Sequence, residues 1–350
     1  MTDKIFTVPF IKGISVTVPE ERVDLRTLTF ADVDIEKIIK TTGIESVRQS
    51  PNDKTISDYC INAAENLFEE LNFDKSEIDG IVFSTYTGDY LSPGSGYIVQ
   101  SALNLSSDCI VIDINQACAG YVYGLFQAFL MIQSGYCKNV LLCVGDTMTK
   151  MIHPKDRAER MILGDAGSAS IISVADTAQK SIFAFHNVGK NFQVLYIPAG
   201  GRKLPIKTGV TDIEKTDEDG NTRTLENLYM DGLELMTFVM YAAPKTVKKV
   251  LNMAKLTKDD ADLFVFHQAN KTIVNSLGRV LRLPAEKVPL HVQEYGNTAS
   301  ASIPLALCLE KNQRDVSMEN AVLCGFGGGL TCAAVALSLQ NTHFAAIHEL

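Results

Sequence analysis

Asp113-Ile114-Asn115-Gln116-Ala117-Cys118-Ala119-Gly120-Tyr121 places one cysteine among small residues, between two apolar runs. The run before it, residues 109–112, predicts a buried strand. The run after it has apolar side chains at helical spacing from Val122 and predicts a helix that ends at Gly135. Cys118 is therefore expected at a strand-to-helix turn, where a helix N-terminus favours the thiolate over the thiol. Such a position suits a nucleophile, and the alternative is a small buried hydrophobic residue.

The composition is that of a globular protein. The chain has 350 residues, of which 46% are hydrophobic and 21% charged, enough for one large core or two fused ones. No apolar run reaches the ~18 residues of a membrane-spanning helix, and the N-terminus shows no signal peptide. We therefore expect a cytoplasmic protein that does not bind membranes. The net charge of −9 argues against nucleic-acid binding.

The eight cysteines indicate neither a metal site nor a disulfide framework. None of them forms a Cys-x-x-Cys pair, and no cluster of His and Cys has metal-ligand spacing. Several lie inside apolar runs, as packing cysteines do. Disulfides are also uncommon in a long chain of cytosolic character.

Strands and helices alternate along the chain, which predicts an α/β fold. Two pairs of segments recur at a separation of about half the chain: residues 76–85 resemble 258–267, and residues 164–172 resemble 327–335. The order within each half is the same, which predicts two pseudo-equivalent α/β halves. We expect an N-terminal half at residues 1–175, with Cys118, and a C-terminal half at residues 176–340.

A polar segment at residues 200–227 interrupts the second half. It contains Pro205, Gly209, Gly220 and the acidic run at 212–219, and it predicts a long surface excursion. We interpret it as an insertion near a substrate mouth, and the alternative is a flexible linker. Residues 228–251 then predict a long helix with Pro244 inside it.

Three further positions suit chemistry. His267 ends the apolar run 263–266, and ligands of α/β folds collect at such strand ends, but a satisfied core histidine is the alternative. Asn297, in a loop of small residues, can donate to a developing oxyanion or can simply cap a turn. Residues 325–329, Gly-Phe-Gly-Gly-Gly, expose backbone N–H groups but lack the Lys-Ser/Thr sequel of a phosphate-binding P-loop. Asp165, between Gly164 and Gly167, is expected to link loops.

Taken together and in this order, the motifs resemble those of β-ketoacyl-acyl-carrier-protein synthase III, a condensing enzyme of the thiolase superfamily. The matching segments are Gln116–Gly120, His267–Asn270, Gly296–Thr298, residues 325–329, Thr42–Ile44 with Arg48, Pro154–Arg157 and Gly164-Asp165. The resemblance covers nearly the whole chain except residues 200–227. It implies a layered αβαβα thiolase fold, a homodimer, acyl carrier protein as a partner, and no cofactor or metal.

The resemblance also implies a mechanism. Cys118 would attack an acyl thioester and hold the acyl group covalently. A malonyl thioester on acyl carrier protein would then lose carbon dioxide, and the resulting carbanion would attack the acyl-enzyme. His267 and Asn297 would stabilise the enolate, and the N–H groups of Cys118 and Gly328 would form the oxyanion hole. The product is a 3-oxoacyl thioester, made in fatty-acid initiation or in a specialised pathway.

The chain departs from the family where a donor carrier would bind. On the thioester and nucleotide side the resemblance assigns Thr42 and Arg157, but Lys37 and Thr41 replace an aromatic residue and an arginine that contact coenzyme A. Lysine can contact phosphate but cannot stack on adenine. The acyl donor is therefore coenzyme A or acyl carrier protein.

For carrier docking, the resemblance points to the helix after His267, where the family's arginine is replaced by Thr272. Basic residues still follow, and such a patch can steer an acidic carrier despite the net charge. The expected docking residues are Gln268, Lys271, Thr272, Arg279, Arg282, Lys248 and Lys249.

In the family that the chain resembles, an aromatic residue limits the acyl pocket across the dimer. In this chain the corresponding segment is Asp89–Ser95, where either Leu91 or Ser92 takes the place of that residue. The length of the acyl group is therefore left open. Two alternative functions also stay open: a related acyltransferase or non-decarboxylative condensing enzyme, and a noncatalytic partner subunit. The intact set of Cys118, His267 and Asn297 argues against the last.

Overall fold

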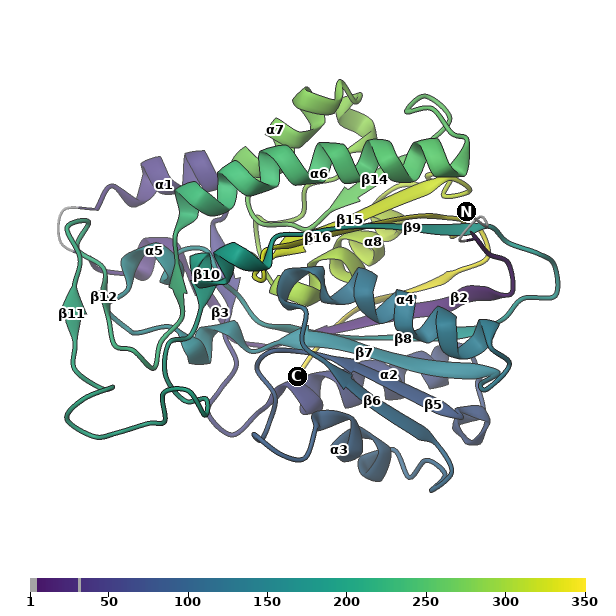
Figure 1. Cartoon of the computed structure of the whole chain (residues 1–350), viewed down its shortest axis with the longest axis horizontal. Coiled ribbons are helices and arrows are strands. Elements are labelled where there is room, and N and C mark those ends of the chain that lie inside the picture. The colour runs from purple at the N-terminus through teal and green to yellow at the C-terminus, as the bar shows by residue number, and fades with distance from the viewer. Residues whose placement is uncertain (1–4, 31–32) are drawn as a thin grey trace.

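Two β-sheets form the framework of the protein (Figure 1). The computed structural model describes residues 5–30 and 33–350. The first sheet has the strand order β17 (His343–Glu349), β2 (Pro9–Val18), β8 (Ala166–Val174), β7 (Asn139–Asp146), β5 (Gly80–Ser84), β6 (Ile110–Ile114). The second has the order β1 (Ile5–Phe6), β9 (Ser181–Asn187), β16 (Thr331–Leu337), β15 (Ala321–Gly327), β14 (Leu263–Phe266).

Helices cover both sheets and also separate them, which makes five layers (Figure 1). Helices α4 (Gly120–Gln133) and α8 (Ser302–Gln313) lie between the sheets and contribute to the largest hydrophobic cluster. Helix α2 (Ile56–Glu70) and helix α3 (Ser95–Ala102) cover the outer face of the first sheet. Helix α6 (Gly232–Ala254) and helix α7 (Lys271–Leu281) cover the second. The predicted αβαβα arrangement is confirmed.

The internal repeat is visible in the strand order. The run β2-β8-β7-β5 corresponds to β9-β16-β15-β14, and in both runs the first two pairings are antiparallel and the last is parallel. The repeated segments of the sequence fall on β5 and β14, and on β8 and β16. Each half also receives a strand from the far end of the chain, because β1 pairs with β9 and β17 pairs with β2. The boundary between residues 175 and 176 stays a prediction.

The strand before Cys118 differs from its expected environment. Strand β6 lies at the edge of the first sheet, and its apolar side chains Ile110, Val111 and Ile112 are only half-buried. An apolar run of this length is typical of a buried strand, but sequence alone does not give the position of a strand within its sheet. The structure therefore gives a half-buried strand in the single chain where the sequence predicted a buried one.

The remaining small elements gather at one end of the layered core, at the left of Figure 1. They include β3 (Arg22–Asp24), α1 (Ile35–Thr42), β4 (Ser46–Arg48), α5 (Arg157–Arg160), β10 (Leu195–Tyr196), β11 (Lys215–Thr216), β12 (Thr222–Arg223) and β13 (Tyr229–Met230). Helix α6 begins later than predicted because Asp231 caps it, accepting from the Glu234 N–H at 3.0 Å. Among the helices of residues 5–30 and 33–350, none is long and apolar enough to cross a membrane.

Candidate active site

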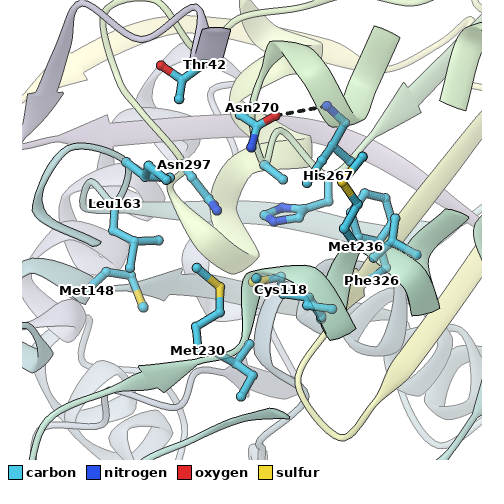
Figure 2. A pocket seen from close by; sticks show the side chains of 18 of the residues that line it. Thr42, Cys118, Met148, Leu163, Met230, Met236, His267, Asn270, Asn297 and Phe326 are labelled. Atoms are coloured by element: carbon cyan, nitrogen blue, oxygen red, sulfur yellow. Dashed lines mark hydrogen bonds between the residues drawn. The ribbon is translucent and has the colours of Figure 1, made fainter. Parts of the chain in front are cut away.

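A mostly apolar cavity of about 270 Å³ contains the three predicted catalytic side chains. Cys118, His267 and Asn297 come from separate segments, and all three line it (Figure 2). Each stands where an element begins or ends: before α4, after β14 and in the loop before α8. The layered fold therefore brings together residues that lie up to 179 positions apart (297 − 118).

Cys118 lies in a short 3₁₀ turn, residues 117–119, that leads into α4. The preceding Ala117 has φ +43°, a left-handed conformation that costs energy for alanine and that is common beside reactive groups. Gly327 packs directly against the cysteine: a Cβ on this glycine would lie 3.0 Å from Cys118 Cβ and 3.3 Å from Sγ. Glycine is therefore required here for the β15 end to approach the nucleophile. The neighbouring Gly328 is half-buried against Leu195.

The protonation state of Cys118 differs from expectation. Burial, with a smaller contribution from Asp146, raises the pKa of the Cys118 thiol to about 12. The expected thiolate rested on the helix N-terminus, whose effect is weaker than desolvation at this depth. In the free protein the resting form is the thiol, so a base has to remove its proton during reaction.

His267 is a buried, neutral imidazole. Burial lowers its pKa to about 3. Its Nδ1 lies 2.6 Å from Ser302 Oγ, and its ring packs edge-on against Phe326 at a centroid distance of 5.3 Å. A hydroxyl can donate or accept, so Ser302 can support either tautomer of the ring. Ser302 was not predicted; it lies 35 residues from His267 in sequence and meets it only through the fold.

Asn297 is held so that its amide can donate into the cavity. Its Oδ1 accepts from the Ala299 N–H at 3.0 Å, which leaves the NH₂ group for other partners. Figure 2 shows the side-chain nitrogen directed toward the space beside His267. The backbone is fixed as well, because Asn297 N–H donates to Ile162 O at 2.8 Å and Gly164 N–H donates to Asn297 O at 3.1 Å.

Two buried carboxylates support the site. Asp165 accepts from the N–H groups of Ser50 and Thr149, each at 2.8 Å, which confirms its expected role in linking loops. Asp146, which the sequence analysis missed, ends β7 and accepts from the Tyr86 N–H at 2.9 Å and from Ser300. Burial raises the pKa of Asp146 to about 6. The sequence could have indicated Asp146 through its position at the end of an apolar strand, which resembles the position of His267.

The mouth of the cavity lies between α1 and α7. Thr41, Thr42 and Thr272 line it, and the Thr272 hydroxyl donates to Thr41 O at 2.7 Å. Beyond the mouth, Lys37 and Arg157 line an adjoining groove of about 640 Å³ together with the tip of the insertion. The predicted position of the insertion near a substrate mouth fits this arrangement.

The residues proposed for carrier docking separate in the structure. Lys271, Arg279 and Arg282 are exposed on or just after α7, and Lys248 is exposed on α6. Gln268 is only 2% exposed, donates to Phe266 O and accepts from the His291 N–H, so its predicted docking role was wrong. Lys249 instead lines a separate groove with Phe126 and Phe183, away from α7.

Within this chain, the wall of the cavity near Cys118 is formed by residues outside the segment Asp89–Ser95. Leu91 and Ser92 are both exposed in the single chain and neither lines its cavity. Their expected position concerned the pocket across a dimer, so that expectation stays a prediction. Tyr86, which was not singled out, lines the cavity together with Met148, Leu195 and Leu228. These side chains form one hydrophobic cluster with Cys118. Tyr86 is the second residue after β5, and nothing in the sequence indicated that its aromatic ring turns inward.

The paired protonation states predict how Cys118 reacts with an alkylating agent. Since the thiol pKa is raised and the imidazole pKa is lowered, we expect no thiolate–imidazolium pair at neutral pH. Alkylation by iodoacetamide should therefore accelerate about tenfold per pH unit from about pH 7 to pH 10. Intact-protein mass spectrometry, corrected with the Cys118→Ser variant, measures this rate. A plateau already reached below about pH 8 would contradict the expectation.

The chain is similar to known synthases over most of its length. Residues 112–190 match the family model described as 3-oxoacyl-[acyl-carrier-protein (ACP)] synthase III, and residues 251–339 match that of its C-terminal part. The chain is 32% identical to a β-ketoacyl-[acyl-carrier-protein] synthase III of Fusobacterium nucleatum, over 92% of this chain and 95% of that protein.

Solved structures agree with this similarity. A 3-oxoacyl-(acyl-carrier protein) synthase from Burkholderia xenovorans superposes with a TM-score of 0.90, at 31% identity, over 99% of this chain and 98% of that one. The priming β-ketosynthase from the R1128 polyketide biosynthetic pathway gives a TM-score of 0.79 at 26% identity, over 94% and 96%. With its layered fold and its buried cysteine, histidine and asparagine, the chain belongs to the 3-oxoacyl-[acyl-carrier-protein] synthase III family of acyltransferases.

Proposed function

We propose that this protein catalyses a decarboxylative condensation between an acyl group held on Cys118 and malonyl-acyl-carrier-protein, giving a 3-oxoacyl-acyl-carrier-protein. The observation that carries the proposal is the meeting of Cys118, His267 and Asn297 in one apolar cavity. The synthases named above support the same reaction class. The likeness to a priming ketosynthase supports a role in a specialised pathway as well as in fatty-acid initiation.

In the first half-reaction, Cys118 Sγ attacks the carbonyl carbon of an acyl thioester. The thiol proton passes to neutral His267 and then to the leaving thiolate, so the imidazole ends neutral again. The backbone N–H groups of Cys118 and Gly328 are proposed to hold the oxyanion. Rigid donors of this kind need no rearrangement as charge develops, and the packing of β15 against the cysteine supports this role.

In the second half-reaction, the malonyl C–C bond breaks and carbon dioxide leaves. The electron pair passes into an enolate, whose oxygen receives hydrogen bonds from Asn297 Nδ2 and the His267 ring. The enolate carbon then attacks the acyl carbonyl and releases the Cys118 thiolate, which takes a proton from water and returns to the resting thiol. The apolar lining strengthens these hydrogen bonds, because water does not screen them.

Carbon dioxide release tests the reaction type. Malonyl-acyl-carrier-protein labelled at the carboxyl carbon should release labelled carbon dioxide in step with 3-oxoacyl product. Acyl transfer or condensation without such release would assign the protein to a non-decarboxylative enzyme. No acylation of Cys118 by any thioester would point to a noncatalytic subunit.

The partners are also proposals. The exposed cations Lys271, Arg279 and Arg282 support docking of an acidic carrier protein near α7. The half-exposed apolar edge strand β6 and the adjoining groove of about 920 Å³ support a homodimer. We also propose that the protein acts in the cytoplasm and needs no cofactor. No group of three potential metal ligands is placed to hold an ion within the described part of the chain.

Tyr86 is expected to limit the length of the acyl group. Its side chain lines the cavity and packs in the same hydrophobic cluster as Met148 and Cys118. Tyr86→Ala should therefore extend the accepted acyl chain by a few carbons, whereas Tyr86→Phe should retain the original limit. Loading rates with acetyl to octanoyl thioesters measure the effect. An unchanged length profile in Tyr86→Ala would exclude Tyr86 as the limiting residue.

A further inference from the structure

The insertion forms a small hairpin that docks on the loop and helix around residues 153–160. Strands β11 and β12 pair in register, and the turn between them, residues 217–221, faces α5. Its anchors are Lys155 Nζ to Glu214 Oε2 at 2.8 Å, Ala158 N–H to Asn221 Oδ1 at 3.1 Å, and Arg223 to the buried Asp156. Within the hairpin, Arg223 also pairs with Asp217 at 3.0 Å. These contacts fix the hairpin as a built part of the site.

The tip of the hairpin binds Arg157. The Arg157 guanidinium donates to Asp219 O. Gly220 has φ +77°, which favours glycine, and a Cβ on it would lie 2.8 Å from Arg157 Cζ, so the guanidinium packs closely against the turn. The arginine that the family resemblance assigns to the nucleotide of coenzyme A is therefore engaged by this chain's own insertion.

The groove beside the mouth has a charge balance that does not suit a nucleotide. It joins the catalytic cavity through Thr41, Thr42 and Ile162, which line both. Its cations are Lys37 and Arg157, and its carboxylates are Asp34 and Asp219. The neighbouring Glu218 is exposed on the same turn. A diphosphate and a 3′-phosphate would meet these like charges and would compete with Asp219 O for Arg157.

We propose that the hairpin, residues 215–223, occupies the nucleotide subsite, so that the priming acyl group arrives on the phosphopantetheine arm of a carrier protein and not on coenzyme A. This inference rests on the proposed function. A pantetheine arm needs only the passage at Thr41 and Thr42, where the groove and the catalytic cavity share lining residues. Binding affinity that a nucleotide would otherwise supply then has to come from contacts with the surface of the carrier protein. The exposed Lys271 and Arg279 of this chain can make such contacts with an acidic carrier.

Loading of Cys118 from three donors with the same acyl group tests the proposal. We expect acyl-coenzyme A and acyl-pantetheine to load with kcat/KM values within about threefold of each other, and the acyl-carrier-protein to load at least about tenfold faster. Adenosine 3′,5′-bisphosphate should not inhibit. A tenfold advantage of acyl-coenzyme A over acyl-pantetheine, inhibition by the bisphosphate, or no advantage of the carrier would overturn it. Loading from none of them would overturn the proposed function and this inference with it.

A gain-of-function variant gives a second test. Replacing residues 217–221 by Gly-Gly releases Arg157 and removes the acidic turn, so the preference for acyl-coenzyme A over acyl-pantetheine should rise about tenfold. Adding Arg157→Ala to that variant should return the preference to about one. Lys40→Ala, at an exposed position of α1 outside the groove, is the matched control. An unchanged preference in a folded hairpin variant would contradict the proposal; if that variant does not fold, the wild-type comparison decides.

Discussion

Cys118→Ser is expected to abolish the acyl-enzyme, with loading reduced about a thousandfold or more. The serine hydroxyl has a far higher pKa than a thiol, and this site already raises the pKa of the thiol to about 12. His267, whose pKa burial lowers to about 3, would then have to accept a proton from a group far less acidic than the thiol. Intact-protein mass spectrometry after incubation with an acyl thioester reads the adduct directly.

Cys109→Ser is the matched control for this experiment. Cys109 and Cys118 are both 7% exposed, and all eight cysteines are free and buried, so exposure alone does not distinguish them. Cys109 directly precedes β6 and does not line the catalytic cavity. The control should acylate like the wild type. A stable adduct on the Cys118→Ser protein would identify another nucleophile.

The features that the sequence predicted correctly are those set by local pattern or by the repeat. Apolar spacing around residues 109–135 was enough to put Cys118 between a strand and a helix, because periodicity reports secondary structure directly. The two recurring segment pairs predicted a duplicated core, and they occupy corresponding strands. The position of His267 after β14 follows from the same run of apolar residues.

The errors and omissions concern properties that depend on distant segments. The predicted thiolate state of Cys118 was wrong because burial raises the pKa of the thiol. That burial results from the residues of the whole cavity, which the local helix pattern does not reveal. Gln268 adjoins His267 in sequence, but its amide is satisfied by Phe266 O and the His291 N–H inside the fold. Ser302 and Tyr86 carry no motif, and only the packing of α8 and β5 around the cavity brings them to the site.

Asn297→Asp is expected to separate the two half-reactions. The substitution keeps the oxygen that accepts from the Ala299 N–H at 3.0 Å, so the loop retains its local hydrogen bond. It replaces the donating NH₂ by an acceptor and places a carboxylate where the enolate charge develops. We expect malonyl decarboxylation to fall about 10²- to 10³-fold, as for loss of an oxyanion donor.

Acyl loading provides the internal control for the same variant. Loading depends on Cys118, His267 and the backbone donors, and it should change less than about threefold, because Asn297 has no part in it. Carbon dioxide release and acyl-enzyme mass are therefore measured on one protein sample. Equal losses in both steps would mean that Asn297 maintains the loop between α7 and α8 and does not hold the enolate. A selective loss of decarboxylation would assign the donor role to its amide nitrogen, which the Ala299 hydrogen bond leaves directed into the cavity.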